Sequence, residues 1–208
     1  MSIDPGLIDM VLRLRGRGIS SNAVLRGVEL APRRHFVPVG KHDIAYTDLA
    51  VPIGCGQTLP PPLTVALMAQ MLDVQPDQKV LLLGAGTGYL AAILARMTTR
   101  IYTVERYKTL ISEADARYRA LGIHNVVTRH GDGRYGWPGQ APFDRIILGY
   151  AVRAEPDALL DQLAPNGKLL GVVDEILTLF TKARKLVTAT EIMPLVLDMA
   201  EAGKSRTL

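Results

Sequence analysis

Apolar and polar residues follow two different rhythms along the middle of this 208-residue chain. Continuous apolar runs of strand length alternate with stretches in which apolar residues recur every three or four positions, as on one face of a helix. The runs predict strands over 79–83, 100–105, 125–129, 143–148 and 167–173. The stretches between them predict helices over 89–97, 108–121 and 156–163. This alternation predicts a doubly wound α/β sheet of mostly parallel strands, with ligands at the carboxyl ends of the strands.

The beginning of the chain follows another pattern. Two short helices are predicted, one over 7–14 and one that starts at a cap on Ser20 or Ser21. Proline and glycine then interrupt the stretch 33–62, and helical spacing resumes over 63–72. A connection as long as 33–62 is usually functional or disordered, and its apolar and aromatic content argues against disorder.

The end of the chain departs from the α/β rhythm. The segments 176–181 and 186–193 predict an antiparallel pair that completes a seven-stranded sheet, and the small polar tail 203–208 is expected to fray. We expect one domain, made of an N-terminal helical appendage with a cover loop (1–62), an α/β core (63–173) and C-terminal strands with a tail (174–208).

Three glycines follow the first predicted strand. Gly84, Gly86 and Gly88 stand between the strand and a helix that begins at Tyr89. Glycine at such positions lets backbone N–H groups approach a ligand closely, and the start of a helix favours an anion. The alternative is a tight strand-to-helix turn without a ligand. The pattern favours a site for a nucleotide-like cofactor.

The spacing of the glycines bears on which cofactor binds. A dinucleotide fingerprint, GxGxxG, would need glycine at position 89, which is Tyr89. GxGxG followed by an acidic residue at the end of the next strand is similar to the first motif of S-adenosylmethionine (SAM) methyltransferases. Glu105 ends that strand about twenty residues after the first glycine, where a carboxylate can accept the hydroxyls of a ribose.

Composition and charge exclude several other classes of protein. The single cysteine, Cys55, rules out an internal disulfide and a multi-thiolate zinc site, and it fits a cytoplasmic protein. The four histidines lack metal-ligand spacing, so no metal is expected. The longest apolar stretch, 80–95, contains three glycines and is shorter than the roughly 20 residues of a membrane span, so no membrane segment is expected. The net charge of +4 is modest and aromatic residues are scarce, so nucleic-acid binding is not expected, although six arginines precede residue 35.

Seven short motifs, spread over nearly the whole chain, resemble the protein-L-isoaspartate O-methyltransferase family. They are RHFVP at 34–38, AYTDLAVPIGCGQT at 45–58, GAGTGY at 84–89, YTVER at 102–106, HGDG at 130–133, PFD at 142–144 and LAPNGKL at 163–169. Several recur in many methyltransferases, whereas the PIGxGQT stretch is specific to this family. The resemblance implies a class I SAM-dependent methyltransferase with a Rossmann-like sheet.

The resemblance also implies an activity and a set of site residues. Methyl transfer would run from SAM to the side-chain carboxylate of an isoaspartyl residue in a damaged protein or peptide, by a monomer or weak homo-oligomer. The methionine part of SAM would lie on the glycine turn, the ribose on the acidic residue after it, and the adenine edge on the HGDG motif. The cofactor residues so implied are Gly84, Ala85, Gly86, Gly88, Glu105, Arg106, Asp132 and Gly133. The cover loop 53–58 would hold the substrate carboxylate, with Thr58 and Gln57 as donors.

Three positions depart from the family pattern. Pro60 replaces the serine of GQTxS, Leu82 replaces an acidic residue before the glycine turn, and Val196 replaces a threonine after PL. Proline has neither a hydroxyl nor an N–H, so two donors to the substrate disappear at once. All three positions are expected to line one cavity, which predicts weak or absent isoaspartyl methylation. Pro60→Ser combined with Leu82→Glu is expected to raise activity or SAM affinity.

Two other functions compete with this interpretation. The first is an inactive paralogue that binds SAM or its product without turnover. The second is a nucleic-acid methyltransferase, which would show an acidic or amide residue followed by Pro-Pro and an aromatic residue after the fourth strand, where this chain has LGYA at 148–151. Cys55 lacks a recognisable base and is expected to be a packed thiol rather than a nucleophile.

Overall fold

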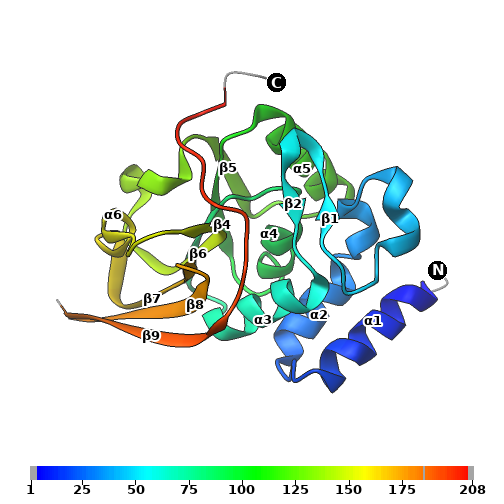
Figure 1. The fold of residues 1–208 in the computed structure, drawn as a ribbon, viewed down its shortest axis with the longest axis horizontal. Helices are drawn as coiled ribbons and strands as arrows, with labels where there is room; N and C mark the ends of the chain where they lie inside the picture. Colours follow the sequence, from blue (N-terminus) through cyan, green and yellow to red (C-terminus); the bar gives the residue numbers. More distant parts are fainter. Residues whose placement is uncertain (1–3, 185, 206–208) are drawn as a thin grey trace.

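A seven-stranded sheet forms the centre of the computed structural model, which describes residues 4–184 and 186–205 (Figure 1). Its strands are β3 (Lys79–Leu83), β4 (Arg100–Glu105), β5 (Val126–His130), β6 (Phe143–Val152), β7 (Leu163–Val173), β8 (Ile176–Ala183) and β9 (Leu186–Pro194). They lie in the order β5-β4-β3-β6-β7-β8-β9, with parallel neighbours up to β7 and antiparallel pairing of β7 with β8 and of β8 with β9. The predicted sheet and its final antiparallel pair are confirmed. Residue 185, in the predicted turn of that pair, lies outside the described residues.

β6 and β7 are each four residues longer than their sequence patterns predict. β6 runs four residues past Leu148, and its pairing with β7 shifts register between Ile147 and Ala151. β7 begins at Leu163 rather than at 167, so the Pro and Gly of LAPNGK lie inside the strand. The helix between them, α6 (Asp157–Leu160), is correspondingly a single turn. A register shift of this kind re-aims side chains at the end of a strand.

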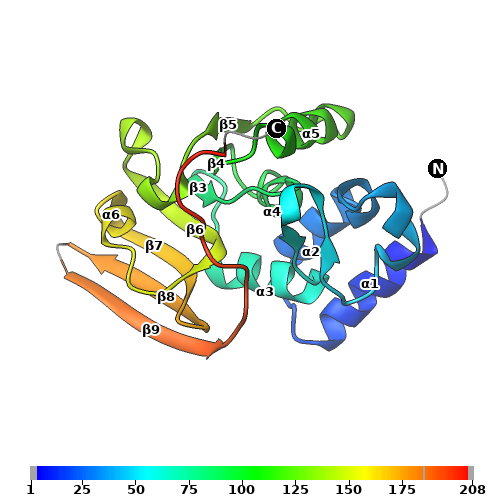
Figure 2. The same cartoon turned by 45° about the horizontal axis from the view of Figure 1, so that its top comes forward.

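Helices cover both faces of the sheet, as predicted. Alternate residues of β3 face opposite sides: Leu82 belongs to a large apolar cluster, and Leu81 and Leu83 belong to a smaller one. The larger cluster includes residues of α3 (Pro62–Leu72), α4 (Tyr89–Leu94) and α5 (Lys108–Ala120), whereas α6 packs on the smaller one. Figure 2 shows α6 and the N-terminal helices at opposite ends of the molecule.

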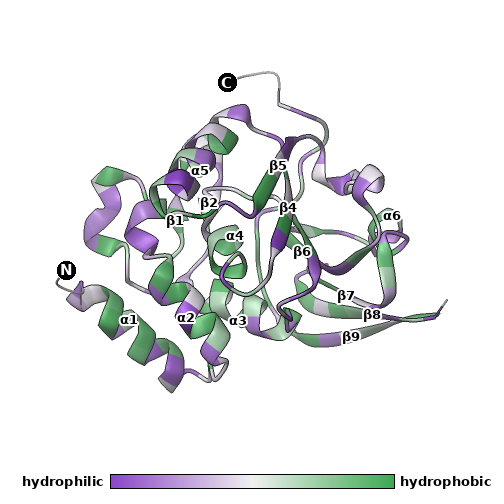
Figure 3. Ribbon diagram, turned by 180° about the vertical axis from the view of Figure 1, so that it is seen from behind, coloured by the Kyte–Doolittle hydropathy of each residue, from purple (hydrophilic) through white to green (hydrophobic). Residues whose placement is uncertain are grey.

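The two predicted N-terminal helices pack beside α3 and α4. They are α1 (Pro5–Gly16), capped by the Asp4 carboxylate, and α2 (Asn22–Leu30), capped by the Ser21 hydroxyl. Each buries one face in the larger cluster, and Figure 3 shows hydrophobic and hydrophilic residues alternating along α1. The helices extend the core of the sheet and leave its carboxyl edge open.

The region 33–62 is ordered without long regular elements. It contains short 3-10 helices at Arg33–Phe36, Val39–Ile44 and Gly54–Gly56, and the two-residue strands β1 (Val51–Pro52) and β2 (Thr58–Leu59). Val51 pairs with Leu59 and Pro52 with Thr58, so residues 51–59 form a small antiparallel hairpin, which we call the cover hairpin.

Length and hydropathy of the helices bear on membrane insertion. Among the residues that the structure describes, no helix is both long and apolar enough to cross a bilayer.

Candidate cofactor and substrate site

A cavity lies where β3, β4 and β6 end, between the cover hairpin and the last residues of the chain. It is lined by ten of the eleven residues predicted for the site: Gln57, Thr58, Pro60, Gly84, Ala85, Gly86, Glu105, Arg106, Asp132 and Gly133. Residues 196–201, which the sequence patterns did not single out apart from Val196, also line it. Segments far apart in the sequence therefore build one site at the carboxyl edge of the sheet, as expected for this architecture.

The glycine turn takes a backbone conformation that other residues rarely adopt. Gly84 and Gly86 have φ angles of +79° and +55°. A Cβ on Gly84 would come within 2.8 Å of the Tyr150 ring, so the turn needs glycine both for its conformation and for space. Gly88, also predicted to contact the cofactor, instead packs outside the cavity lining, where a Cβ would lie 2.5 Å from the Tyr118 hydroxyl.

Glu105 ties the end of β4 to the glycine turn. Its Oε2 accepts a hydrogen bond from the Gly86 N–H at 2.9 Å. Its Oε1 accepts from the N–H groups of Arg106 at 2.7 Å and Tyr107 at 3.0 Å. A carboxylate offers about four acceptor positions, so one on Oε2 remains for a ribose hydroxyl. Glu105 therefore keeps acceptor capacity toward the cavity, and its contact with both ribose hydroxyls stays a prediction.

Asp132 is held from two sides. Its carboxylate accepts hydrogen bonds from the Arg134 guanidinium, the shortest at 2.7 Å, and from the Gly203 N–H at 2.7 Å. Burial alone would raise its pKa, but the hydrogen bonds from Arg134 and Gly203 outweigh burial and lower the pKa. The carboxylate is therefore ionised at neutral pH and largely engaged by protein donors.

The tail that was expected to fray is fixed as far as it is described. Besides the contact of Gly203 with Asp132, the Ser205 N–H donates to the Arg106 carbonyl at 3.2 Å. The fraying prediction is wrong for 203–205, because backbone N–H groups there find partners at the ends of β4 and β5. Residues 206–208 lie outside the described part.

Arg33 ties together the segments on either side of the cover hairpin. Its side chain is fully buried, and its guanidinium donates to the carbonyls of Ala45 (3.3 Å), Thr47 (3.2 Å), Leu49 (3.1 Å) and Pro60 (3.0 Å). Burial lowers its pKa, and nearby Tyr89 and Asp48 partly oppose that shift. The sequence patterns missed this residue, because a charged side chain whose partners are all carbonyls leaves no side-chain pattern.

The three residues predicted to face the substrate lie on the cover hairpin and directly after it. Thr58 lies in β2, and the Gln57 amide donates to the Cys55 carbonyl at 3.3 Å and to the Tyr107 hydroxyl at 3.5 Å. Pro60 lines the cavity while its carbonyl is taken by Arg33. At this point of the wall, Pro60 presents carbon where serine would present a hydroxyl.

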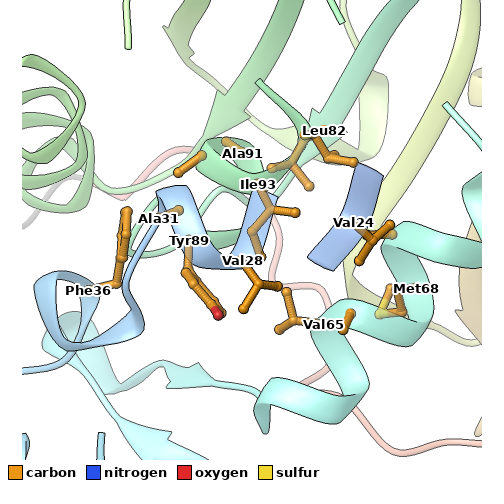
Figure 4. Packing of buried hydrophobic residues seen from close by; sticks show 14 of the residues in the cluster. Val24, Val28, Ala31, Phe36, Val65, Met68, Leu82, Tyr89, Ala91 and Ile93 are labelled. Carbon is orange, nitrogen blue, oxygen red and sulfur yellow. The ribbon is translucent and has the colours of Figure 1, made fainter. Parts of the chain in front are cut away.

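Leu82 does not line the cavity, contrary to prediction. Its side chain is fully buried in the larger apolar cluster, and Figure 4 shows it among the residues of that cluster with Val24 and Ile93. The glycine turn is fixed by Glu105 from the neighbouring strand. Only Pro60 and Val196 of the three departures face the cavity, so Leu82→Glu would place a carboxylate in the core rather than restore a polar site.

Cys55 and His130 have structural surroundings. Cys55 is partly buried, and burial, followed by the charges of Glu105 and Glu113, raises the pKa of its thiol. A ring nitrogen of His130 contacts the Arg106 carbonyl at 2.9 Å, which is a structural role. Within 4–184 and 186–205, no group of three or more His, Cys, Asp or Glu side chains is placed to hold a metal ion.

The fold and the cavity together define a class of protein. A mostly parallel seven-stranded sheet, a glycine turn after the inner strand β3 and a buried glutamate at the end of β4 are the features of a class I SAM-dependent methyltransferase with a Rossmann-like sheet.

Comparison with known proteins narrows the class to a family. The sequence model of the protein-L-isoaspartate(D-aspartate) O-methyltransferase family matches residues 8–196. A protein-L-isoaspartate O-methyltransferase of Maricaulis maris is 44% identical over 209 residues, covering 99% of this chain and 98% of that protein. One of Rhodospirillum rubrum is 47% identical over 171 residues, covering 82% of this chain and 78% of that protein. The chain belongs to the protein-L-isoaspartate O-methyltransferase family and is a SAM-dependent methyltransferase.

Solved structures agree on the fold. A protein-L-isoaspartate O-methyltransferase superposes with a TM-score of 0.83 at 23% identity, over 94% of this chain and 66% of that one. A second, from Plasmodium falciparum in complex with S-adenosyl-L-homocysteine, gives 0.79 at 22% identity, over 93% and 97% of the two chains. The predicted fold class and family are confirmed. The alternative of an inactive paralogue gains no support, because the relatives carry the name of the enzyme.

Proposed function

We propose that this protein transfers the methyl group of SAM to the side-chain carboxylate of isoaspartyl residues in damaged proteins. The observation that carries the proposal is that, in a member of this family, the cover hairpin and the glycine turn line the same cavity. A substrate carboxylate under the hairpin and a methyl donor on the turn would therefore meet there. Proximity of this kind supplies much of the rate in a bimolecular transfer.

Methyl transfer to a carboxylate requires no proton transfer by the protein's own side chains. When bound, SAM supplies a methyl group activated by its sulfonium. The substrate carboxylate is already ionised at neutral pH, so its oxygen forms the new bond to the methyl carbon while the carbon–sulfur bond breaks and its electron pair stays on sulfur. No general base is needed, and the protein's work is alignment and exclusion of water.

Each part of the wall has a proposed role in that alignment. Gly84, Ala85 and Gly86 hold the methionine part of the cofactor, Glu105 accepts from the ribose, and Arg106, Asp132 and Gly133 surround the remainder of the nucleoside. The Thr58 hydroxyl and the Gln57 amide donate to the substrate carboxylate. Gly88 supports the turn by packing against Tyr118 rather than by touching the cofactor.

The rate is expected to be reduced by Pro60. A serine in its place would add one hydroxyl and one N–H facing the reacting carboxylate. The negative charge of the carboxylate is lost as the ester forms, so a donor here acts by aligning the carboxylate, and misalignment can lower a rate by about a hundredfold. Thr58 and Gln57 remain, so we propose a slow enzyme rather than an inactive one.

The experiment that tests the proposal is transfer of a radiolabelled methyl group from SAM to an isoaspartyl peptide. The matched control is the same peptide with normal aspartate at that position. We expect incorporation into the isoaspartyl peptide alone. Equal incorporation into both peptides, or none above background into either, would contradict the proposal.

The setting of the reaction is also proposed. The single cysteine fits a reducing compartment and the net charge of +4 gives no strong attraction for nucleic acid, so we propose a cytoplasmic protein acting on peptides and proteins. We further propose one domain, because residues from each of the segments 1–62, 63–173 and 174–208 line one cavity. We propose that this domain works as a monomer or weak homo-oligomer.

A further inference from the structure

The chain returns across the sheet after its last strand. Residues 195–205, which we call the C-terminal segment, run from the end of β9 past β6 toward β4 and β5 (Figures 1 and 2). The Ala151 N–H donates to the Asp198 carbonyl and the Ala200 N–H donates to the Ala151 carbonyl, both at 2.8 Å. These two bonds fix the segment at the cavity and place Glu201 beside the end of β4.

Glu201 joins the C-terminal segment to the cover hairpin through Tyr107. The Tyr107 hydroxyl donates to Glu201 Oε2 at 3.2 Å and accepts from the Gln57 amide at 3.5 Å. The Arg106 guanidinium also pairs with Glu201 Oε2. Gln57, Arg106 and Glu201 all line the cavity, so the chain of contacts runs along its wall from the cover hairpin to the C-terminal segment.

A phenol hydroxyl bridges in this way only while it carries its proton, because it must donate to one partner and accept from the other. Burial raises the pKa of Tyr107, Arg106 opposes that shift, and the hydrogen bond to Glu201 raises the pKa further. Tyr107 is therefore protonated at neutral pH.

We propose that Glu201 is a positioning residue that acts through Tyr107 to hold Gln57 and to close the cofactor cavity between the cover hairpin and the C-terminal segment. The proposal rests on the proposed function, since Gln57 is the donor to the substrate carboxylate. Release of the cofactor product then requires the contacts of Glu201 to open. We call the set Gln57, Tyr107, Arg106 and Glu201 the latch.

The strength of the latch suits a contact that opens in every turnover. The Glu201 side chain is 56% exposed, and exposed ion pairs contribute little because water screens them. The Tyr107 residue is less exposed than Glu201, so its hydroxyl contributes most of the free energy that keeps the cavity closed. Its two hydrogen bonds both break when the cover hairpin and the C-terminal segment separate. Loss of the hydroxyl should speed opening without unfolding the domain.

The test measures the dissociation rate of S-adenosyl-L-homocysteine from the full-length protein by surface plasmon resonance. Tyr107→Phe and Glu201→Ala are each expected to raise the rate by about 3- to 10-fold, the effect of one or two net hydrogen bonds. Glu201→Gln keeps an oxygen acceptor for Tyr107, so its rate should lie nearer to wild type. The double variant Tyr107→Phe/Glu201→Ala should dissociate no faster than the faster single variant, because both changes break the same connection.

Glu29→Ala is the matched control. Glu29 is an exposed glutamate that pairs with Arg26 on α2 and lies outside the cavity, so its removal should leave the dissociation rate unchanged. Thermal unfolding of each variant checks that the fold is retained.

Dissociation rates of Tyr107→Phe and Glu201→Ala equal to wild type would overturn the latch, and so would additive effects in the double variant. A wild-type protein that binds S-adenosyl-L-homocysteine but transfers no methyl group would refute the proposed function while the dissociation rates still decide on the latch. A wild-type protein that binds none would refute both.

Discussion

Arg33→Lys is expected to lower the free energy of unfolding by about 3 kcal/mol, because a lysine cannot replace the four hydrogen bonds of the guanidinium. In the structure two different nitrogens serve two pairs of carbonyls, Ala45 with Thr47 and Leu49 with Pro60. An ammonium has three donors on one atom and reaches one pair at most. The figure assumes that two bonds are lost at about 1.5 kcal/mol each, the lower end for hydrogen bonds to a charged group.

The assay is thermal unfolding together with amide hydrogen exchange. A loss of about 3 kcal/mol corresponds to a fall in Tm of roughly 6–12 °C in a chain of this size. Exchange should speed up in 45–60, the segment whose carbonyls Arg33 holds, before it does so in the sheet. The control is Arg34→Lys, since the neighbouring Arg34 side chain is 53% exposed and its loss should change stability by less than about 0.5 kcal/mol. Equal Tm values for the two variants would refute the reasoning.

Three further predictions concern the cavity and the core. Pro60→Ser should raise kcat/KM for an isoaspartyl peptide by up to about a hundredfold in the radiolabelled transfer assay, because the added donors align the carboxylate. An unchanged value would mean that residue 60 does not face the reacting carboxylate. Leu82→Glu should lower the free energy of unfolding by about 3–5 kcal/mol in urea denaturation, whereas Leu82→Met should lower it by less than about 1.5 kcal/mol. Asp132→Asn should lower Tm at pH 7. Because the pKa of Asp132 is lowered in the folded state, its stabilising contribution is complete above the unfolded pKa of about 3.9 and is lost as pH falls through the folded pKa. The difference in Tm between wild type and Asp132→Asn should therefore shrink below about pH 4. A difference that stays constant with pH would contradict this account.

The sheet and its order of elements could be predicted because they depend on local patterns. The run at Lys79–Leu83 reads as a strand from its apolar residues alone, and Gly84 marks the turn from its conformational freedom. The same logic predicts a site next to the glycine turn, since the carboxyl ends of neighbouring parallel strands meet at one edge, and a cavity does lie there.

The contacts that close the site could not be predicted, because they have no local pattern. Arg33 binds backbone carbonyls, which every residue carries, and Gly203 reaches Asp132 through its own backbone N–H. Leu82 was misplaced for a related reason. Residue alternation along β3 sends it to the face covered by α3, α4 and α5, and a comparison of family motifs does not show which face a strand residue takes.

The placement of Leu82 changes which step the sequence departures affect. Because Glu105 holds the glycine turn through the Gly86 N–H, the cofactor side keeps its main support although residue 82 is apolar. Pro60 and Val196 both lie on the cavity wall, and Pro60 directly follows the cover hairpin, where we propose that the substrate binds. A donor lost there weakens alignment of the reacting carboxylate without touching the cofactor turn. The departures should therefore appear in the rate of methyl transfer, while the affinity for SAM stays close to that of a family member with serine at residue 60.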